Sequence, residues 1–129
     1  MIASARAAAF ALALAAGAAV AAPRGDPQAG ETIYTRCLAC HALAYNRTGP
    51  KHCGLFGRRA GGVTGFQYSD AMRRSKIVWN ERTLDRFLAD PLKTVPGTAM
   101  GYAGVKDLKE RADLIAYLKQ ANDSPACRK

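Results

Sequence analysis

Two thiols and an imidazole lie within five residues in the segment RCLACHALAYNRTGP, residues 36–50. Cys37 and Cys40 are three residues apart, which places both side chains on one face of a helical turn, and His41 follows directly. This C-x-x-C-H spacing is typical of a c-type haem attachment site, in which two thioethers hold the ring and the histidine binds the iron. We therefore expect one covalently bound haem here, with His41 as a metal ligand.

Two other uses of the thiol pair compete with haem attachment. A thioredoxin-like redox pair belongs in a βαβ context, and the sequence has no such strand pattern. A zinc site completed by His52, Cys53 or Cys127 usually contains a second close pair of ligands, which is absent from this sequence. Haem attachment is therefore the favoured interpretation.

The sixth coordination position of a haem iron decides between electron transfer and ligand chemistry. Its candidates after His41 are His52, Met72 and Met100. Met72 belongs to an expected short helix, where packing is its predicted role. Met100 ends the segment VPGTAM, residues 95–100, whose Pro-Gly pair suits a tight turn that can direct a thioether to a metal. The pattern favours Met100 as the second metal ligand.

The N-terminal segment MIASARAAAFALALAAGAAVAA has the layout of a secretory signal peptide, with a basic residue (Arg6), an apolar stretch and small residues before the cleavage point. We expect cleavage after Ala21, so that residues 1–21 are the signal peptide and residues 22–129 form one mature domain in the periplasm. A retained membrane anchor is the alternative, but the run is short and alanine is only weakly apolar.

The chain of 129 residues carries 19 Lys and Arg against 10 Asp and Glu, a formal charge of +9. Such an excess can indicate nucleic-acid binding, but no basic helix is interleaved with aromatic residues, and export removes the protein from nucleic acid. A cationic face that attracts acidic protein partners is the favoured interpretation. The alternative is that the charge serves only solubility.

The mature sequence predicts short helices separated by loops rich in glycine and proline, without alternating strand patterns, and therefore an all-α fold. Asp26, Ser69 and Asn80 are expected N-caps. Helices are expected within residues 25–37, 69–75, 80–91 and 106–122, and irregular chain over 54–66 and 91–104. The last helix should bury Leu108, Ile115 and Leu118. Short helices and long loops form too small a hydrophobic core to be stable alone, which implies a large cofactor that completes the core.

Several motifs along the mature chain together resemble those of class I cytochrome c, close to mitochondrial cytochrome c and its bacterial periplasmic relatives. The similarity runs from about Gly25 to Ala121. It rests on CLACH, TGP at 48–50, GLFGRRAG at 54–61, YSDAM, IVW, TLDRFLADP, VPGTAM and ERADLIAYLK. The resemblance implies a small cytochrome c fold, with short helices and long loops wrapped around one covalently bound haem.

The resemblance also implies roles for single residues around the iron. His41 and Met100 would be the two axial ligands. Pro50 would accept a hydrogen bond from the far ring nitrogen of His41 and so fix the orientation of the imidazole. Gly30 would allow the first and last helices to cross closely, near Leu114 and Tyr117.

Four further residues would contact the haem propionates. Tyr68 and Trp79 would hydrogen-bond to a buried propionate, and Arg58 would offset its charge. Thr98 would contact the other propionate. The family fold would also bring the end of the last helix near the loop of Cys53, so a Cys53–Cys127 disulfide is expected.

Some positions depart from the family pattern. Phe87 stands where mitochondrial relatives have a tyrosine that hydrogen-bonds to the ligand sulfur. Ala99 replaces a lysine next to the ligand methionine, and Thr94 replaces an aromatic residue. His52 precedes Cys53 where the family usually has an apolar residue, which places the imidazole near the haem with a role that the sequence does not define.

The implied function is that of a soluble monohaem carrier, not an enzyme, which moves single electrons between redox partners in a respiratory chain. Its partners would be the acidic surfaces of an oxidase, a reductase or a dehydrogenase. We expect a monomer that binds no nucleic acid and does not insert stably into the membrane once the signal is removed. The alternatives are a haem peroxidase or gas-binding cytochrome, with His52 as its acid–base group, or a cytochrome subunit bound to a dehydrogenase.

Overall fold

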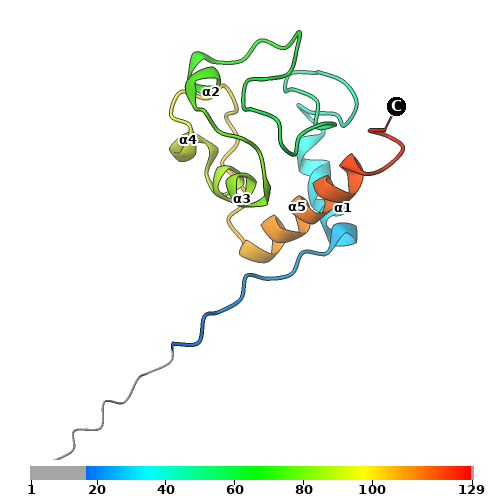
Figure 1. Cartoon of the computed structure of the whole chain (residues 1–129), viewed down its shortest axis with the longest axis vertical. Helices are drawn as coiled ribbons and strands as arrows, with labels where there is room; N and C mark the ends of the chain where they lie inside the picture. The colour runs from blue at the N-terminus through cyan, green and yellow to red at the C-terminus, as the bar shows by residue number, and fades with distance from the viewer. Residues whose placement is uncertain (1–16, 129) are drawn as a thin grey trace, which may run out of the picture.

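A computed structural model of the protein describes residues 17–128. Residues 1–16, which contain most of the expected signal peptide, lie outside the described residues. Residues 17–24 form an exposed, irregular segment that leads away from the folded domain (Figure 1). The helical elements are α1 (Pro27–Tyr34), η1 (Thr35–Cys37), α2 (Asp70–Arg74), α3 (Glu81–Ala89), α4 (Pro91–Thr94) and α5 (Leu108–Asn122). Within residues 17–128 the only strand-like pairing is an isolated bridge between Arg59 and Val78, in agreement with the expected all-α class.

Three helices begin at the N-caps that the sequence predicts. Asp26 accepts a hydrogen bond from the backbone of Gln28 at the start of α1. Ser69 accepts one from Met72 N at the start of α2, and Asn80 forms a reciprocal capping box with Thr83 at the start of α3. Local side-chain chemistry therefore sets where these helices start.

Helix α4 corrects one expectation, because residues 91–104 were predicted to be wholly irregular. Pro91 ends α3, but it also occupies the first position of a new helical turn, where its missing N–H costs nothing. Asp90 caps this turn by accepting a hydrogen bond from Lys93 N. The irregular segment therefore begins only after Thr94.

Helices α1 and α5 pack directly against each other, and they lie side by side in Figure 1. A Cβ atom added at Gly30 would lie 1.9 Å from the carbonyl oxygen of Asp113 and 2.8 Å from Cβ of Tyr117. Only a residue without a side chain permits this approach, which explains a glycine inside a helix. The predicted close crossing of the first and last helices is confirmed.

The buried face of α5 differs in one respect from the prediction. Ile115 and Leu118 are buried as expected, and Leu114, directly before Ile115, is 1% exposed. Leu108, however, is 61% exposed, so its predicted burial is wrong. It is the first residue of the helix, directly after the cap Asp107.

A disulfide joins Cys53 to Cys127 across 74 positions of sequence, as expected. The same two regions also meet through Asn122 Oδ1, which accepts hydrogen bonds from Gly54 N at 2.7 Å and Leu55 N at 3.2 Å. The C-terminal end of α5 is therefore fastened to the loop that follows the C-x-x-C-H motif.

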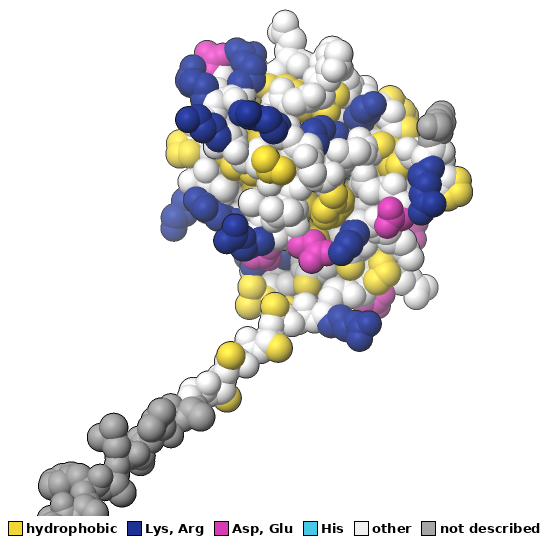
Figure 2. All heavy atoms as spheres, in the orientation of Figure 1, with side chains coloured by type: hydrophobic (Ala, Val, Ile, Leu, Met, Phe, Trp, Pro, Cys, Tyr) yellow, Lys and Arg dark blue, Asp and Glu magenta, His cyan; other side chains and the backbone are white. Residues whose placement is uncertain are grey.

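Basic side chains are spread over the face of the molecule drawn in Figure 2, and they gather most densely over the end that contains α2. Exposed residues of that region include Arg73, Arg74 and Lys76. Asp70 pairs with both arginines, so the local excess of positive charge is only partly offset. Among the described residues, no helix has the length and apolar character needed to cross a membrane.

Candidate functional site

A cavity of about 540 Å³ lies in the interior of the domain, among the helices and the loops of residues 38–69 and 95–107. Every site residue that the sequence predicts lines this cavity: Cys37, Cys40, His41, Pro50, Arg58, Tyr68, Trp79, Thr98 and Met100. The structure thus brings together residues that are up to 63 positions apart in the sequence. Its walls are largely apolar, and they include Leu84, Phe87 and Leu114.

The C-x-x-C-H residues occupy a single turn that begins at Cys37, the last residue of η1. The backbone N–H groups of Cys40 and His41 both donate to the carbonyl oxygen of Cys37, at 3.1 and 2.9 Å. This turn holds the two thiols three positions apart and directs His41 into the buried interior. Burial raises the pKa of the Cys37 thiol. Two thiols on one turn at the mouth of a cavity suit attachment to two points on one edge of a planar group.

His41 is buried and is held at its ring edge. Its Nδ1 donates a 2.8 Å hydrogen bond to the carbonyl oxygen of Pro50. Because a carbonyl can only accept, this bond requires the proton on Nδ1 and leaves the Nε2 lone pair for a metal. Burial lowers the pKa of His41, although the bond to Pro50 opposes this effect. The imidazole is therefore neutral at neutral pH, which is the form that binds metals.

Gly49 is a functional position that the sequence reading missed. A Cβ atom at this residue would lie only 2.3 to 2.6 Å from three atoms of the His41 ring. The backbone of Gly49 thus reaches the imidazole where any side chain would displace it. A glycine before Pro50 was visible in the sequence, but nothing local distinguishes a glycine that faces a ligand from one in an ordinary turn.

His52 lies against His41, and these are the only two histidines in the chain. Their ring centroids are 4.3 Å apart and their planes differ by 22°. His52 Nδ1 is 2.9 Å from the hydroxyl of the buried Tyr34. Burial, with smaller effects from His41 and Arg58, lowers the pKa of His52 to about 3, so this ring is neutral.

The stacking of His52 on His41 argues against His52 as the sixth iron ligand and as the acid–base group of a peroxidase. Two imidazoles stacked face to face cannot bind one iron from opposite sides, so His52 does not fit the sixth position. For the same reason it does not fit the acid–base group of a peroxidase, which must lie on the side opposite His41. Met72 and Met100, which both line the cavity, remain as candidates for the second ligand.

Met100 is carried by a tight turn after α4. Thr98 N donates to the carbonyl oxygen of Val95 at 2.9 Å, and Gly97 has a φ of +90°, which glycine adopts without strain. Pro96 and Gly97 thus form the predicted turn. The hydroxyl of Thr98 then accepts a 3.2 Å hydrogen bond from Met100 N. These contacts hold the thioether of Met100 at the cavity.

Arg58 is a partly buried guanidinium that lacks an acidic partner among the contacts found within residues 17–128. Its Nη1 donates to the carbonyl oxygen of Cys53 at 3.1 Å and its Nη2 to that of Lys51 at 3.0 Å. Its Nε is buried without any hydrogen-bond partner. Burial lowers the pKa of Arg58. A buried donor of this kind calls for an acceptor that enters the cavity, and a carboxylate satisfies both its charge and its N–H.

Tyr68, Trp79 and Thr98 add polar groups to a mainly apolar cavity. The hydroxyl of Tyr68 accepts a 3.2 Å hydrogen bond from Val63 N and keeps its own proton to donate. Trp79 is 7% exposed and is fixed through its backbone, which exchanges hydrogen bonds with Gly57 N and with the carbonyl of Arg58. These residues could donate to carboxylates at the edge of a bound ring.

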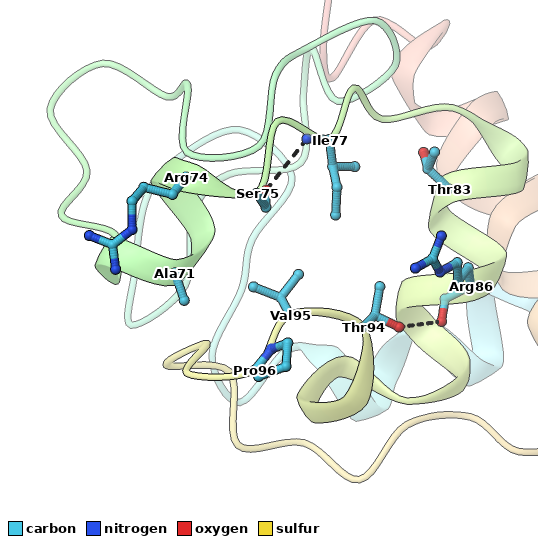
Figure 3. A pocket seen from close by; sticks show the side chains of 9 residues that line it. All are labelled: Ala71, Arg74, Ser75, Ile77, Thr83, Arg86, Thr94, Val95 and Pro96. Carbon is cyan, nitrogen blue, oxygen red and sulfur yellow. Dashed lines mark hydrogen bonds between the residues drawn. The ribbon is translucent and has the colours of Figure 1, made fainter.

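A second cavity, of about 430 Å³, lies among α2, α3 and α4 (Figure 3). The hydroxyls of Ser75, Thr83 and Thr94 line it, but each already donates to a backbone carbonyl. Figure 3 shows the Arg74 side chain turned away from the centre of this cavity. It therefore offers a ligand few free donors and lacks the cysteine–histidine chemistry of the first cavity.

The first cavity fits a haem on three independent observations. Its apolar volume suits a flat hydrophobic ring, and the turn of Cys37, Cys40 and His41 suits attachment and ligation. The unpartnered Nε of Arg58 suits a propionate. The donor set of one imidazole and one thioether is that of electron-transfer haems.

Known proteins with similar sequences and structures are cytochromes c, in agreement with a haem in the first cavity. The family model described as cytochrome c matches residues 27–122. Cytochrome c2 from Blastochloris viridis is 46% identical over 100 residues, which cover 75% of this chain and 79% of that protein. Cytochrome c from Ginkgo biloba is 45% identical over 104 residues, covering 78% and 92%. The solved structure of cytochrome cH from Methylobacterium extorquens has a TM-score of 0.72 and 44% identity, and the match covers 74% of this chain and 99% of that one.

The matched region contains all the residues that line the first cavity. Members of this family carry one covalently attached haem c, and they are electron carriers. The predicted all-α fold, wrapped around a haem, is therefore confirmed. The chain belongs to the class I cytochrome c family and is a monohaem electron-transfer protein.

Proposed function

We propose that the protein is a periplasmic carrier of single electrons whose haem is ligated by His41 and Met100. The observation that carries this proposal is the placement of one neutral imidazole and one thioether, from distant parts of the chain, at the same cavity as the two motif cysteines. When bound, the haem supplies an iron that alternates between the ferric and ferrous states. Cys37 and Cys40 would tether the ring at one edge.

The residues of the chain would favour the ferrous state and keep the site rigid. Both proposed ligands are uncharged, so neither offsets the extra positive charge of ferric iron, and the apolar walls of the cavity offer it little solvation. The hydrogen bond from His41 to Pro50 and the turn that carries Met100 restrain both ligands, so little has to move when an electron is exchanged.

Arg58, Tyr68, Trp79 and Thr98 would hold the haem propionates. Arg58 is suited to this role because its buried Nε lacks a partner within the described residues. Tyr68 can still donate its phenol proton, and the Thr98 hydroxyl, which accepts from Met100 N, can donate as well. This arrangement would bury a propionate charge beside a fixed guanidinium.

The mature protein, residues 22–129, would be a monomer in the periplasm after removal of residues 1–21. Its redox partners would present acidic surfaces, because the basic excess remains after the loss of Arg6. Such encounters are brief and depend on charge steering.

A kinetic experiment tests the proposed carrier function. Reduced holoprotein is mixed with an acidic or a basic redox protein at increasing salt, and the rate of electron exchange is followed by haem absorption. We expect exchange with the acidic partner to be the faster reaction and to slow as salt rises. Rates independent of salt, or rapid uptake of carbon monoxide by the reduced protein, would contradict the proposal.

A further inference from the structure

His52 presents the face of its ring to the face of His41, at a centroid distance of 4.3 Å and an angle of 22°. The hydrogen bond from His41 Nδ1 to Pro50 fixes one point on the edge of the ring. A ring held at one edge can still tilt about that contact. A flat neighbour against its face removes this remaining freedom.

The ring of His52 is itself held from the opposite direction. Its Nδ1 is 2.9 Å from the hydroxyl of Tyr34, a residue of α1 that is only 4% exposed. Tyr34 packs in turn against Tyr117 of α5, with ring centroids 5.0 Å apart. A chain of contacts therefore leads from the crossing of α1 and α5 to the face of the proposed iron ligand.

The backbone of His52 is equally restrained. Its N–H donates to the carbonyls of Ala42 and Leu43, both at 3.1 Å, and Cys53 N donates to Leu43 at 2.7 Å. Arg58 spans the same stretch by donating to the carbonyls of Lys51 and Cys53. The disulfide between Cys53 and Cys127 joins this stretch to the C-terminal end of the chain. These hydrogen bonds and the disulfide therefore fix the backbone that carries the His52 ring.

We infer that His52 is a positioning residue that sets the orientation of the His41 ring plane, with Tyr34 and the disulfide-linked loop as its support. This inference rests on the proposed ligation of the haem by His41. The plane of an axial imidazole determines which iron d orbital it meets, and hence how unpaired spin spreads over the ferric haem. The reduction potential of the iron also depends on the contacts that hold the His41 ring.

Substitutions in ferric holoprotein test this inference. His52→Leu removes the flat face and the partner of Tyr34, whereas His52→Phe removes the polar partner but keeps a flat ring. We expect His52→Leu to change the pattern of haem methyl shifts in the proton NMR spectrum and to shift the reduction potential. His52→Phe, which keeps the flat face but loses the contact with Tyr34, should change the pattern and the potential by clearly less than His52→Leu does. Tyr45→Leu, at a side chain that is 63% exposed, is the control and should change neither.

The outcomes separate this inference from the proposed ligation. If the native protein lacks the spectrum of histidine–methionine ligation, the proposed function fails. If the native protein has that spectrum and His52→Leu keeps both its methyl shift pattern and its potential, the inference on His52 is overturned. Equal changes in the Leu and Phe variants would also overturn it, because the flat face would then be irrelevant.

A milder variant serves if His52→Leu does not accumulate as holoprotein. Tyr34→Phe removes only the hydroxyl that holds His52 and leaves the packing against Tyr117. Like His52→Phe, which loses the same hydrogen bond, it should move the methyl shifts and the potential measurably but by less than His52→Leu does. A spectrum and potential identical to those of the native protein would show that the support from Tyr34 does not position His41.

Discussion

The backbone N–H of Asp26 donates a 2.6 Å hydrogen bond to Oδ1 of Asp113, so the start of α1 is fastened to the middle of α5. The Asp113 side chain is only 7% exposed and also pairs with Lys109, one turn earlier in α5. These contacts, the Lys109 pair first and the Asp26 N–H second, lower the pKa of Asp113. The carboxylate therefore stabilises the crossing of the two helices only while it is ionised.

Acid should weaken this crossing in a definite pH range. Because the pKa of Asp113 is lower in the folded state than its ordinary value near 3.9, its contribution is fully present above about pH 4–5. It is lost as the pH falls through the folded-state pKa. At pH 7, Asp113→Asn should reduce the free energy of unfolding by about 1.5–3 kcal/mol, the usual range for hydrogen bonds to charged groups.

Urea unfolding followed by the fluorescence of Trp79, the single tryptophan, measures this effect between pH 7 and pH 3. The difference between the native protein and Asp113→Asn should shrink below pH 4. Asp123→Asn, at an exposed position, is the control and should show no such convergence. A gap that stays constant down to pH 3 would contradict the role given to the Asp113 carboxylate.

Gly30→Ala should destabilise the protein even though alanine is the better helix former by about 1 kcal/mol. The added Cβ would lie 1.9 Å from the carbonyl oxygen of Asp113, so α1 and α5 would have to separate. Overpacking of this kind costs about 1–3 kcal/mol net. Chemical denaturation of Gly30→Ala against Glu31→Ala, an exposed neighbour on the same helix, isolates the contact. Equal stability of the two variants would mean that the crossing tolerates a methyl group.

Removal of the disulfide by Cys53→Ser with Cys127→Ser should lower the free energy of unfolding by about 4 kcal/mol, on the chain-entropy estimate for a loop of this length. The haem absorption spectrum should be unchanged, because the bridge lies outside the cavity. Reduction of the native protein should reproduce the same loss. Titration of denatured, unreduced native protein with a thiol reagent is the direct check, and two reactive groups would disprove the bridge.

Arg58→Gln should lower the reduction potential. A guanidinium beside the cavity disfavours the additional positive charge of ferric iron, so its removal makes the ferric state easier to form. Arg58→Lys keeps the charge and should retain most of the potential, although it loses the fork that spans the carbonyls of Lys51 and Cys53. Voltammetry of both variants decides the matter. An unchanged potential in Arg58→Gln would exclude a charge at this position from tuning the iron.

Local signals in the sequence were sufficient for the starts of α1, α2 and α3 and for the turn of Cys37 and Cys40. Asp26, Ser69 and Asn80 cap helices through contacts within three residues, and the backbone of Cys40 and His41 hydrogen-bonds to Cys37 within one turn. The turn at Pro96 and Gly97 indicated Met100 as a ligand candidate, whereas the role of Arg58 came from the family resemblance, because its contact with the cavity depends on long-range folding.

The features that the sequence reading missed involve residues with two possible uses or contacts across the fold. Pro91 reads as the end of a helix, and only the cap from Asp90 shows that it also begins α4. Leu108 fits an apolar stripe, but as the first residue of α5 it is exposed. The stack of His52 on His41 joins residues 11 positions apart through a loop whose path no local pattern predicts.

Ligation of the iron by Met100 is the central claim, and the ferric absorption spectrum tests it most directly. The chain offers a matched control, because Met72 places a second thioether, itself buried, at the same cavity. We predict a sulfur-to-iron charge-transfer band in the native ferric protein that persists in Met72→Leu and disappears in Met100→Leu. A native protein without this band, or one that loses it only in Met72→Leu, would contradict the account.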